Sequence, residues 1–172
     1  NGNRVWSRSF QGPGLYKDGL RDMAVDAAGN VYMTGYSYGL PDGPSQLRSY
    51  NYLTLKYSSN GDMMWSRYYG PNPGYDDFPR SLKIDAAGNA YVAGYSWGIN
   101  TYANYATVKY DTDGNQMWAQ RFAGGYGELL NEVEVDSTGN VYVTGYSNSS
   151  QAGGSEDIVT IKYNSNGDQQ WL

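Results

Sequence analysis

The chain has 172 residues, among them 19 Tyr, 5 Trp and 23 Gly, and only 17% of its residues are charged; because aromatic side chains suit half-buried pleated sheets and Gly marks tight turns, this composition predicts an all-β protein. The formal net charge of −5 argues against a nucleic-acid partner and against an anionic membrane surface, since both need an excess of Lys and Arg. The absence of Cys excludes a disulfide framework, and no apolar run is long enough to span a bilayer, so we expect no membrane insertion.

The first residues of the chain carry a pattern that returns near its other end. Residues 1–6, Asn-Gly-Asn-Arg-Val-Trp, match residues 166–171, Asn-Gly-Asp-Gln-Gln-Trp, and the same Gly turn precedes Trp65 and Trp118. A Gly turn followed by such a run predicts a strand that carries the Trp. We therefore expect residues 1–17 to hold the last strand of a preceding sheet and a linker.

The next feature is a motif that occurs three times, at residues 26–37, 85–96 and 136–147, and reads Asp-x-x-Gly-Asn-x-Tyr-x-x-Gly-Tyr-Ser. The apolar alternation directly before each Asp predicts a first strand. Asp-x-x-Gly-Asn predicts a tight hairpin turn with its Gly in the left-handed region, and the residues after it predict a second strand.

Each motif is followed by a third predicted strand that ends in Lys-Tyr, at residues 54–57, 107–110 and 160–163. In the first copy its apolar face consists of Leu53, Leu55 and Tyr57. The Gly turn and the Trp strand come next. Each unit of about 55 residues is thus expected to be an antiparallel meander of four strands.

Tandem four-stranded units predict the blades of a β-propeller, because a sheet that is apolar on both faces must stack on neighbours. The alternative all-β architecture is a sandwich, which seldom repeats the same turn chemistry in every hairpin. We expect one array, in which residues 1–17 belong to a preceding blade, residues 18–70 form blade 1, residues 71–123 form blade 2, and residues 124–172 form blade 3 with an incomplete last strand.

The Asp-x-x-Gly-Asn block, the Thr-Ile-Lys-Tyr strand and the Asn-Gly-x-x-x-Trp ending together resemble the SBBP repeat. This is a β-propeller repeat of mainly bacterial and archaeal secreted or surface proteins. The strand order is also similar to that of NHL-type blades. The resemblance implies a propeller and an extracellular or cell-surface setting in a microbe; it implies no particular activity, because members of the family generally lack an assigned one.

Three blades are fewer than the four to eight of closed propellers and leave two apolar faces uncovered. One explanation is that the chain is a piece of a longer array, which agrees with a start at Asn rather than Met. The other is that copies form a homo-oligomer, either a completed ring or a filament, in which the N-terminal strand completes the last blade of a neighbour. Residues 169–172 would compete for that edge.

The chain contains no His and no Cys, so the commonest catalytic bases, nucleophiles and transition-metal ligands are missing. We therefore expect no enzyme activity. Asp18, Asp77 and Glu128 occupy one position of the repeat, and Asp26, Asp85 and Asp136 occupy another; both sets are expected to accept backbone hydrogen bonds. Asp76 and Asp77 are adjacent on an extended segment and should point apart rather than form an acid–base pair.

No cofactor is expected, and the one candidate metal is calcium. Asp111, Asp113 and Asn115 have the alternating oxygen ligands of the first half of an EF-hand loop, but the downstream Glu is missing, and a simple hairpin turn is the preferred interpretation. Lys56, Lys109 and Lys162 should lay their stems on a neighbouring blade and pair their ammonium groups. Asn51, Asn104 and Asp157, at the start of the third strands, are expected to be polar anchors.

The candidate binding surface lies at the end opposite the tight turns, where the longer connections emerge. The longest is 39–48. Rigid aromatic rings beside polar groups suit a glycan or a protein partner. The aromatic residues expected at this end are Tyr38, Tyr50, Tyr75, Trp97, Tyr102 and Tyr126, together with Tyr16.

The most favoured function is a non-catalytic scaffold, adhesion or assembly module outside a microbial cell. It would bind its partner through the aromatic end or through the edges of its blades. The alternatives are a lectin-like carbohydrate-binding propeller, a subunit of a surface filament and, least favoured, an enzyme domain that uses loop carboxylates.

Overall fold

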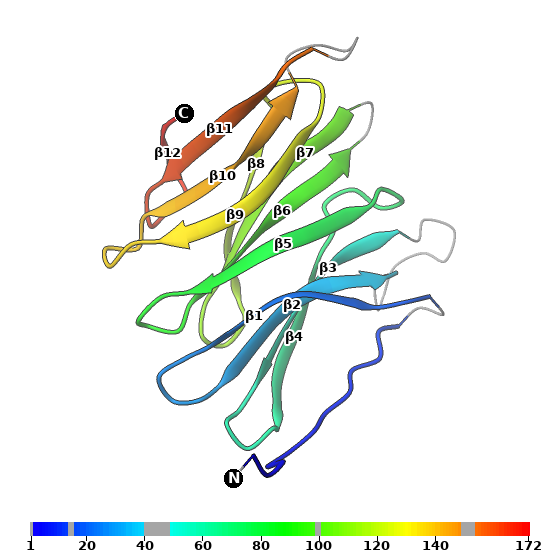
Figure 1. Ribbon diagram of the computed structural model, residues 1–172, viewed down its shortest axis with the longest axis vertical. Coiled ribbons are helices and arrows are strands. Elements are labelled where there is room, and N and C mark those ends of the chain that lie inside the picture. The colour runs from blue at the N-terminus through cyan, green and yellow to red at the C-terminus, as the bar shows by residue number, and fades with distance from the viewer. Residues whose placement is uncertain (1, 14–15, 40–48, 99–100, 149–153) are drawn as a thin grey trace.

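The computed structural model describes residues 2–13, 16–39, 49–98, 101–148 and 154–172 (Figure 1). These residues form β-strands and no helix. The strands are β1 (Gly19–Val25), β2 (Val31–Tyr38), β3 (Tyr50–Tyr57), β4 (Met63–Tyr69), β5 (Asp77–Ile84), β6 (Ala90–Gly98), β7 (Thr101–Tyr110), β8 (Gln116–Phe122), β9 (Glu128–Val135), β10 (Val141–Asn148), β11 (Glu156–Tyr163) and β12 (Gln169–Trp171). No helix that could cross a membrane occurs in the described part of the chain.

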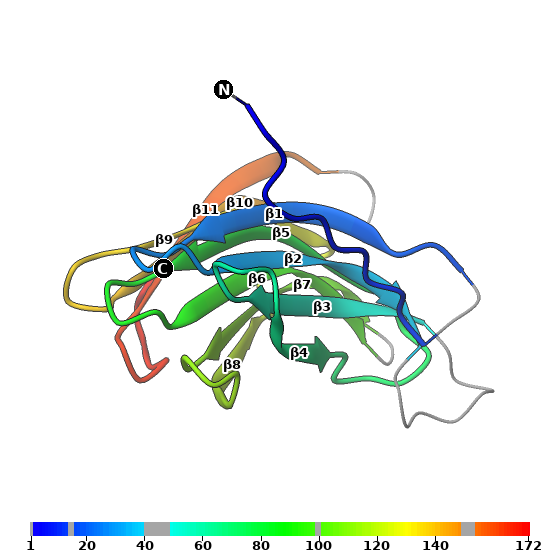
Figure 2. The same ribbon diagram turned by 90° about the horizontal axis from the view of Figure 1, so that it is seen from below.

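The strands form three four-stranded sheets, in which each strand pairs antiparallel with the next: β1–β4, β5–β8 and β9–β12. We call these sheets blades 1, 2 and 3. The predicted all-β class and the three four-stranded meanders are confirmed, and the sandwich alternative is wrong. The blades lie side by side as an open fan, with the first strands β1, β5 and β9 on one side and β4 and β8 on the other (Figures 1 and 2).

The hairpin between the first two strands owes its shape to the Asp and the Gly of the repeated motif. In the turn of blade 1, Gly29 has a φ of 81°, in the left-handed region that a residue with a Cβ rarely adopts. The Asp26 carboxylate accepts hydrogen bonds from the backbone N–H groups of Ala28 and Asn30 at 3.0 and 2.8 Å. In the turn of blade 3, the hydrogen bond from the Asn140 side chain and one from Thr138 lower the pKa of Asp136. The predicted turn-capping role of these aspartates is confirmed.

Neighbouring blades are held together by apolar cores between their faces. Tyr32, Tyr52 and Trp65 of blade 1 pack against Leu82 and Val92 of blade 2, and all five side chains are buried. Each such aliphatic side chain contributes about 1.5–3 kcal/mol by leaving water. The hydroxyl groups of Tyr32 and Tyr52 donate to the carbonyls of Gly88 and Ala106 at 2.9 and 3.2 Å, so the tyrosines are buried with their polar atoms satisfied.

Two expectations about the connections and ends are wrong. The second and third strands of blade 2 extend to Gly98 and from Thr101, so their connection is short rather than long. No strand forms among residues 2–13. The last strand of blade 3 is shorter than those of the other blades: β12 has three residues, whereas β4 and β8 have seven each. Residue 1, residues 14–15 and residues 40–48, which make up most of the longest predicted loop, lie outside the described residues.

Candidate functional site

The aromatic residues predicted for the binding surface lie at or next to the strand ends opposite the tight turns, the end at which β2, β6 and β10 finish. Four of them were expected in loops, and this is wrong, because they lie within strands. The strand residues are Tyr38 in β2, Tyr50 in β3, Trp97 in β6 and Tyr102 in β7. Tyr75 and Tyr126 lie in the connections that precede β5 and β9.

Tyr38 and Tyr50 belong to a packed ring cluster between blades 1 and 2. The ring of Tyr38 lies 4.5 Å from that of Tyr16 and 5.2 Å from that of Tyr50, measured between centroids. Tyr50 in turn lies 5.5 Å from Phe78 of β5, and Tyr36 lies 5.3 Å from Phe78. These edge-on and tilted contacts are worth about 0.5–1.5 kcal/mol each beyond burial. The cluster therefore joins the two blades, and Tyr16 at its edge is 64% exposed.

Trp97, Tyr102 and Tyr126 instead line one surface pocket of about 250 Å³ between blades 2 and 3, which we call the blade 2–3 pocket. Their side chains are 40%, 38% and 46% exposed. The rings of Tyr102 and Tyr126 meet edge to face, 5.7 Å apart. Three of the six predicted residues thus come together in one concave site.

Backbone hydrogen bonds fix the chain at two of the pocket residues. The N–H of Trp97 donates to the carbonyl of Asp76 at 3.1 Å. The N–H of Tyr126 donates to the carbonyl of Asn148 at 2.9 Å, and the N–H of Asn148 donates to the carbonyl of Gly127 at 3.0 Å. These bonds restrain the backbone positions from which the two rings extend.

The pocket also contains polar groups and further apolar lining. Glu156 at the start of β11 contributes a carboxylate, and Asn148 at the end of β10 contributes an amide. Tyr146 and Leu129 complete the apolar wall. None of the described residues that line it is a Lys or an Arg. Tyr75, the sixth predicted residue, is not part of this pocket; its backbone N–H bonds the carbonyl of Asn72 at 3.2 Å.

The carboxylates that share one repeat position have different partners. Asp18 accepts a hydrogen bond from the N–H of Gly12 at 2.7 Å, and Glu128 accepts from the N–H groups of Gly124 and Gly125. The predicted backbone role is confirmed for these two. It is wrong for Asp77, which is fully buried and has no hydrogen-bond partner among the described residues for either carboxylate oxygen.

The connection before β5 differs in sequence from the other two. Donors stand six residues before the carboxylate in blade 1 and four and three residues before it in blade 3. In blade 2 the residues six and four places earlier are Pro71 and Pro73, which have no N–H, whereas Gly74, three places earlier, has an N–H that does not bond the carboxylate of Asp77. Burial raises the pKa of Asp77 to about 7, although Ser96 and Arg121 act in the opposite direction. Its neighbour Asp76 accepts a bond from the N–H of Tyr50 at 2.9 Å, so the two carboxyl groups do not form a pair.

The calcium candidate is arranged as a hairpin turn. One oxygen of Asp111 accepts from the N–H groups of Asp113 and Asn115 at 3.0 and 2.7 Å, and the other accepts from the side-chain amide of Asn115 at 2.8 Å. The expected ligand oxygens of Asp111 are therefore engaged by the turn itself. Among the described residues, no group of three acidic side chains is placed to hold a metal ion.

Two of the three repeated lysines, Lys56 and Lys109, have the structural role that the sequence predicts. Lys56 donates to the carbonyl of Thr112 in the next blade at 3.0 Å, and its ammonium lies 4.8 Å from the ring centre of Tyr32. Lys109 donates in the same way to Ser165 at 3.1 Å. Two of the three predicted anchors are also placed: Asn51 donates to the carbonyl of Ser49 at 2.9 Å, and Asn104, with its amide nitrogen turned toward Glu128, lies 3.1 Å from that carboxylate.

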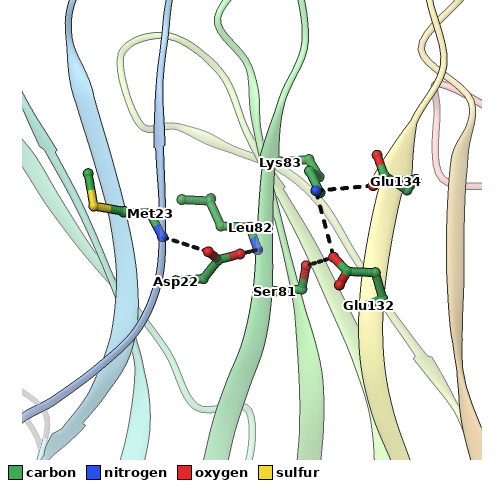
Figure 3. Close-up of polar contacts among 7 residues, drawn as sticks. All are labelled: Asp22, Met23, Ser81, Leu82, Lys83, Glu132 and Glu134. Atoms are coloured by element: carbon green, nitrogen blue, oxygen red, sulfur yellow. Dashed lines mark hydrogen bonds and ion pairs between the residues drawn. The ribbon is translucent and has the colours of Figure 1, made fainter.

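A polar row along the first strands was missed by sequence reasoning (Figure 3). Asp22 of β1 accepts from the N–H of Leu82 in β5 at 2.8 Å, and Ser81 of β5 donates to Glu132 of β9. Asp22, Ser81 and Glu132 share one place, four residues before the turn Asp, and this recurrence of polar residues is the signal that could have revealed the row. These hydrogen bonds link the first strands of the three blades, β1, β5 and β9.

The cation beside this row is Lys83, which lies 3.0 Å from Glu134 and 3.8 Å from Glu132 (Figure 3). The hydrogen bond with Glu134 is the main cause that raises the pKa of Lys83. All three side chains are at least 36% exposed, so the ion pairs add about 1 kcal/mol or less.

Comparison with known protein families identifies the repeat. A family model described as a β-propeller repeat, SBBP, matches residues 65–100, from Trp65 in β4 through β6. This match confirms the resemblance drawn from the motifs, and the matched stretch contains the Asp-x-x-Gly-Asn turn that recurs in blades 1 and 3. None of the curated proteins compared with the chain matches it.

Proposed function

Since the chain is built from β-propeller repeats, we propose that it is a non-catalytic binding module that recognises its ligand in the blade 2–3 pocket. The observation that carries this proposal is the convergence of Trp97, Tyr102 and Tyr126 on one concave surface while each ring stays partly exposed. The rings of Tyr38 and Tyr50 instead pack in the cluster between blades 1 and 2 and do not line this pocket.

The chemistry of the pocket suits a ligand with apolar faces and polar edges. The rings offer rigid contact area with two side-chain torsions each, so little conformational entropy is lost on binding. The carboxylate of Glu156 and the phenol groups supply hydrogen bonds at the rim. Sugar rings and peptide segments share this chemistry, and a lectin-like specificity for glycans is the alternative to a protein partner.

The absence of a catalytic function is part of the proposal. Among the described residues that line the pocket, Glu156 is the only one with a carboxylate, whereas glycoside hydrolysis needs two acidic groups. The carboxyl group with the most strongly raised pKa, Asp77, does not line the pocket. A placement outside a microbial cell, as part of a scaffold or adhesion protein, follows from the resemblance to secreted and surface repeats.

The test is ligand capture by the whole chain on a glycan array and on a peptide array, followed by titration of the strongest hit. We expect Trp97→Ala to weaken binding at least about tenfold, because one of the three rings is lost. The matched control is Tyr75→Ala, which removes an aromatic residue from the same end of the blades but outside the pocket. Equal affinities for Trp97→Ala and the parent chain would place the ligand elsewhere; hydrolysis of a glycan by the parent chain would refute the non-catalytic assignment.

A further inference from the structure

The blade 2–3 pocket coincides with a change of side chain in the repeat. Between blades 1 and 2, the ring of Tyr50 lies 5.2 Å from that of Tyr38 and 5.5 Å from that of Phe78. Ala103 takes the place of Tyr50 in the next blade, and Trp97 takes the place of Tyr38. Since a methyl group stands where the first boundary has a phenol ring, Trp97 keeps 40% of its surface exposed.

A second change concerns cations that blades 1 and 2 hold over their own tyrosines. The guanidinium group of Arg21 lies 5.0 Å from the ring centre of Tyr36, and that of Arg80 lies 5.3 Å from the ring centre of Tyr95. Both arginines stand at a register shift of the first strand, five places before the turn Asp. Each of these two blades thus supplies a cation to the ring at this place of its second strand.

Blade 3 lacks this arginine. The residue at the register shift of β9 is Asn131, which has no charge. The ring that corresponds to Tyr36 and Tyr95 is Tyr146, and it lines the blade 2–3 pocket. Blade 3 therefore leaves without its own cation a ring that blades 1 and 2 supply with one.

The other rings of the pocket carry no cation of the chain either. Among the described residues, Lys or Arg side chains lie over aromatic rings in all three blades, namely those of Tyr32, Tyr36, Trp65, Tyr91, Tyr95 and Tyr142. None of these six rings lines the pocket. The rings of Trp97, Tyr102 and Tyr126 are thus partly exposed, and no Lys or Arg of the described residues lies over them.

The electrostatics of the pocket favour a cation over a neutral group. The face of an aromatic ring attracts a cation, and the indole of Trp does so most strongly. The rings of Tyr102 and Tyr126 are inclined by 68° and form two adjacent walls. Glu156 adds a full negative charge to the same lining, which contains no Lys or Arg among its described residues.

Resting on the proposed function, we propose that the protein partner inserts a lysine side chain into the blade 2–3 pocket. Its ammonium group lies against the ring faces and next to the carboxylate of Glu156. Lysine fits better than arginine, because rings inclined at a large angle surround a compact ammonium, whereas a planar guanidinium stacks flat on one ring. The formal net charge of −5 also attracts a basic partner.

The test is titration of the whole chain with a short, end-capped peptide of Gly and Ser that has one central Lys, followed by NMR. Matched peptides carry Nε-acetyl-lysine or Arg at the centre. We expect the Lys peptide to bind at least about fivefold more tightly than the Nε-acetyl-lysine peptide, because acetylation removes the charge. The Cε protons of the bound Lys should shift upfield, since they lie over ring faces, and the indole N–H signal of Trp97 should move.

Substitutions in the pocket separate a cation site from a merely apolar one. Trp97→Leu keeps an apolar side chain but removes the aromatic face, so it should weaken the Lys peptide at least about fivefold, and Trp97→Phe should weaken it less. Glu156→Gln should weaken it by about two- to fivefold and reduce the loss of affinity in high salt. Trp97→Leu and Trp97→Phe with equal affinities would overturn the assignment of the ring faces.

The sharpest variant lies outside the rings. Asn131→Arg installs the arginine of blades 1 and 2, whose charge should repel the incoming ammonium and weaken the Lys peptide at least about threefold. The matched control is Asn131→Gln, which is neutral and should leave the affinity unchanged. Because Asn131 is exposed, the far-UV circular dichroism of both variants should match that of the parent chain. Equal affinities of the two variants would contradict the role of the missing arginine.

The peptides distinguish this inference from the function on which it rests. Equal binding of the Lys and Nε-acetyl-lysine peptides, or tighter binding of the Arg peptide, would overturn the lysine assignment. If no Lys peptide binds while a ligand from the arrays is lost in Trp97→Ala, the pocket is a binding site for another chemistry and only this inference fails. If Trp97→Ala affects no ligand at all, the proposed function fails as well.

Discussion

The boundary between blades 1 and 2 and the boundary between blades 2 and 3 share one framework and differ at two places. In both, a Lys and a Trp of one blade bond the same carbonyl of the next, Thr112 or Ser165. At the boundary between blades 1 and 2, packed rings fill the end opposite the tight turns, and the Asp77 carboxylate accepts no hydrogen bond from the described residues. At the boundary between blades 2 and 3, the same end is open as a pocket, and the Glu128 carboxylate accepts backbone hydrogen bonds. The repeated residues therefore set the spacing of the blades, while the connections decide what each boundary can do.

The largest effect that distinguishes the boundaries should come from their tryptophans. Trp65 is almost fully buried, whereas Trp118 is only partly buried. We expect Trp65→Ala to lower the free energy of unfolding by about 3–5 kcal/mol, and Trp118→Ala by less, because a larger cavity opens at the first boundary. Urea unfolding of both variants measures this, with the exposed Met64→Ala as control. Equal losses of unfolding free energy in Trp65→Ala and Trp118→Ala would show that the different burial of the two side chains does not affect stability.

The second effect concerns the charge of Asp77. Its pKa is raised from 3.8 to about 7, so between these values the folded chain holds a proton that the unfolded chain has released. Stability must then fall as the pH rises from about 4 to about 7. Asp77→Asn should remove this fall and stabilise the protein at pH 8 by about 2–4 kcal/mol, since each pKa unit corresponds to about 1.4 kcal/mol. Unfolding curves at pH 5 and pH 8 measure it; a parent and variant with the same pH profile would contradict it.

Glu128, at the same place in the other boundary, should respond with the same sign and a smaller effect. Burial raises the pKa of Glu128, but the N–H groups of Gly125 and Gly124 donate to its carboxylate and lower it. Glu128→Gln removes the buried charge but weakens these hydrogen bonds, so it should stabilise the protein at pH 8 by less than Asp77→Asn does. Urea unfolding of both variants at pH 8 measures this; a Glu128→Gln variant that is stabilised as much as Asp77→Asn, or that is destabilised, would contradict it.

The smallest effect should come from restoring a donor near Asp77. Pro71→Ala supplies an N–H six residues before the carboxylate, the spacing at which Gly12 donates to Asp18. We expect the pKa of Asp77 to fall by about one unit, because a hydrogen bond to the carboxylate favours its charged form. The carboxyl carbon shift of Asp77 in an NMR titration reports this, and the pKa in Pro73→Ala shows which proline matters more. An unchanged pKa of Asp77 in both variants would show that the prolines are not the reason why this pKa is raised.

The aromatic residues show how far the site could be predicted. Composition and strand order were sufficient to place Trp97, Tyr102 and Tyr126 at the same end of the molecule. They could not show that Tyr38 packs on Tyr50 and Tyr50 on Phe78 while the other three rings leave a hollow, because this depends on how far each strand extends and how its connection folds back. The polar row of Asp22, Ser81 and Glu132 was also hidden, since its bonds join strands of different blades.

The sequence by itself determined the repeat, the four strands of each unit, the tight turns and the order of the blades. It could do so because side-chain alternation and Gly turns act over a few residues and recur in the same order. Only the tertiary structure decided that Trp6 docks without forming a strand, that Asp77 is left without a donor and that the second boundary opens into a pocket. These outcomes depend on contacts between residues about fifty positions apart, whose distances are set by the stacking of whole blades rather than by local pattern.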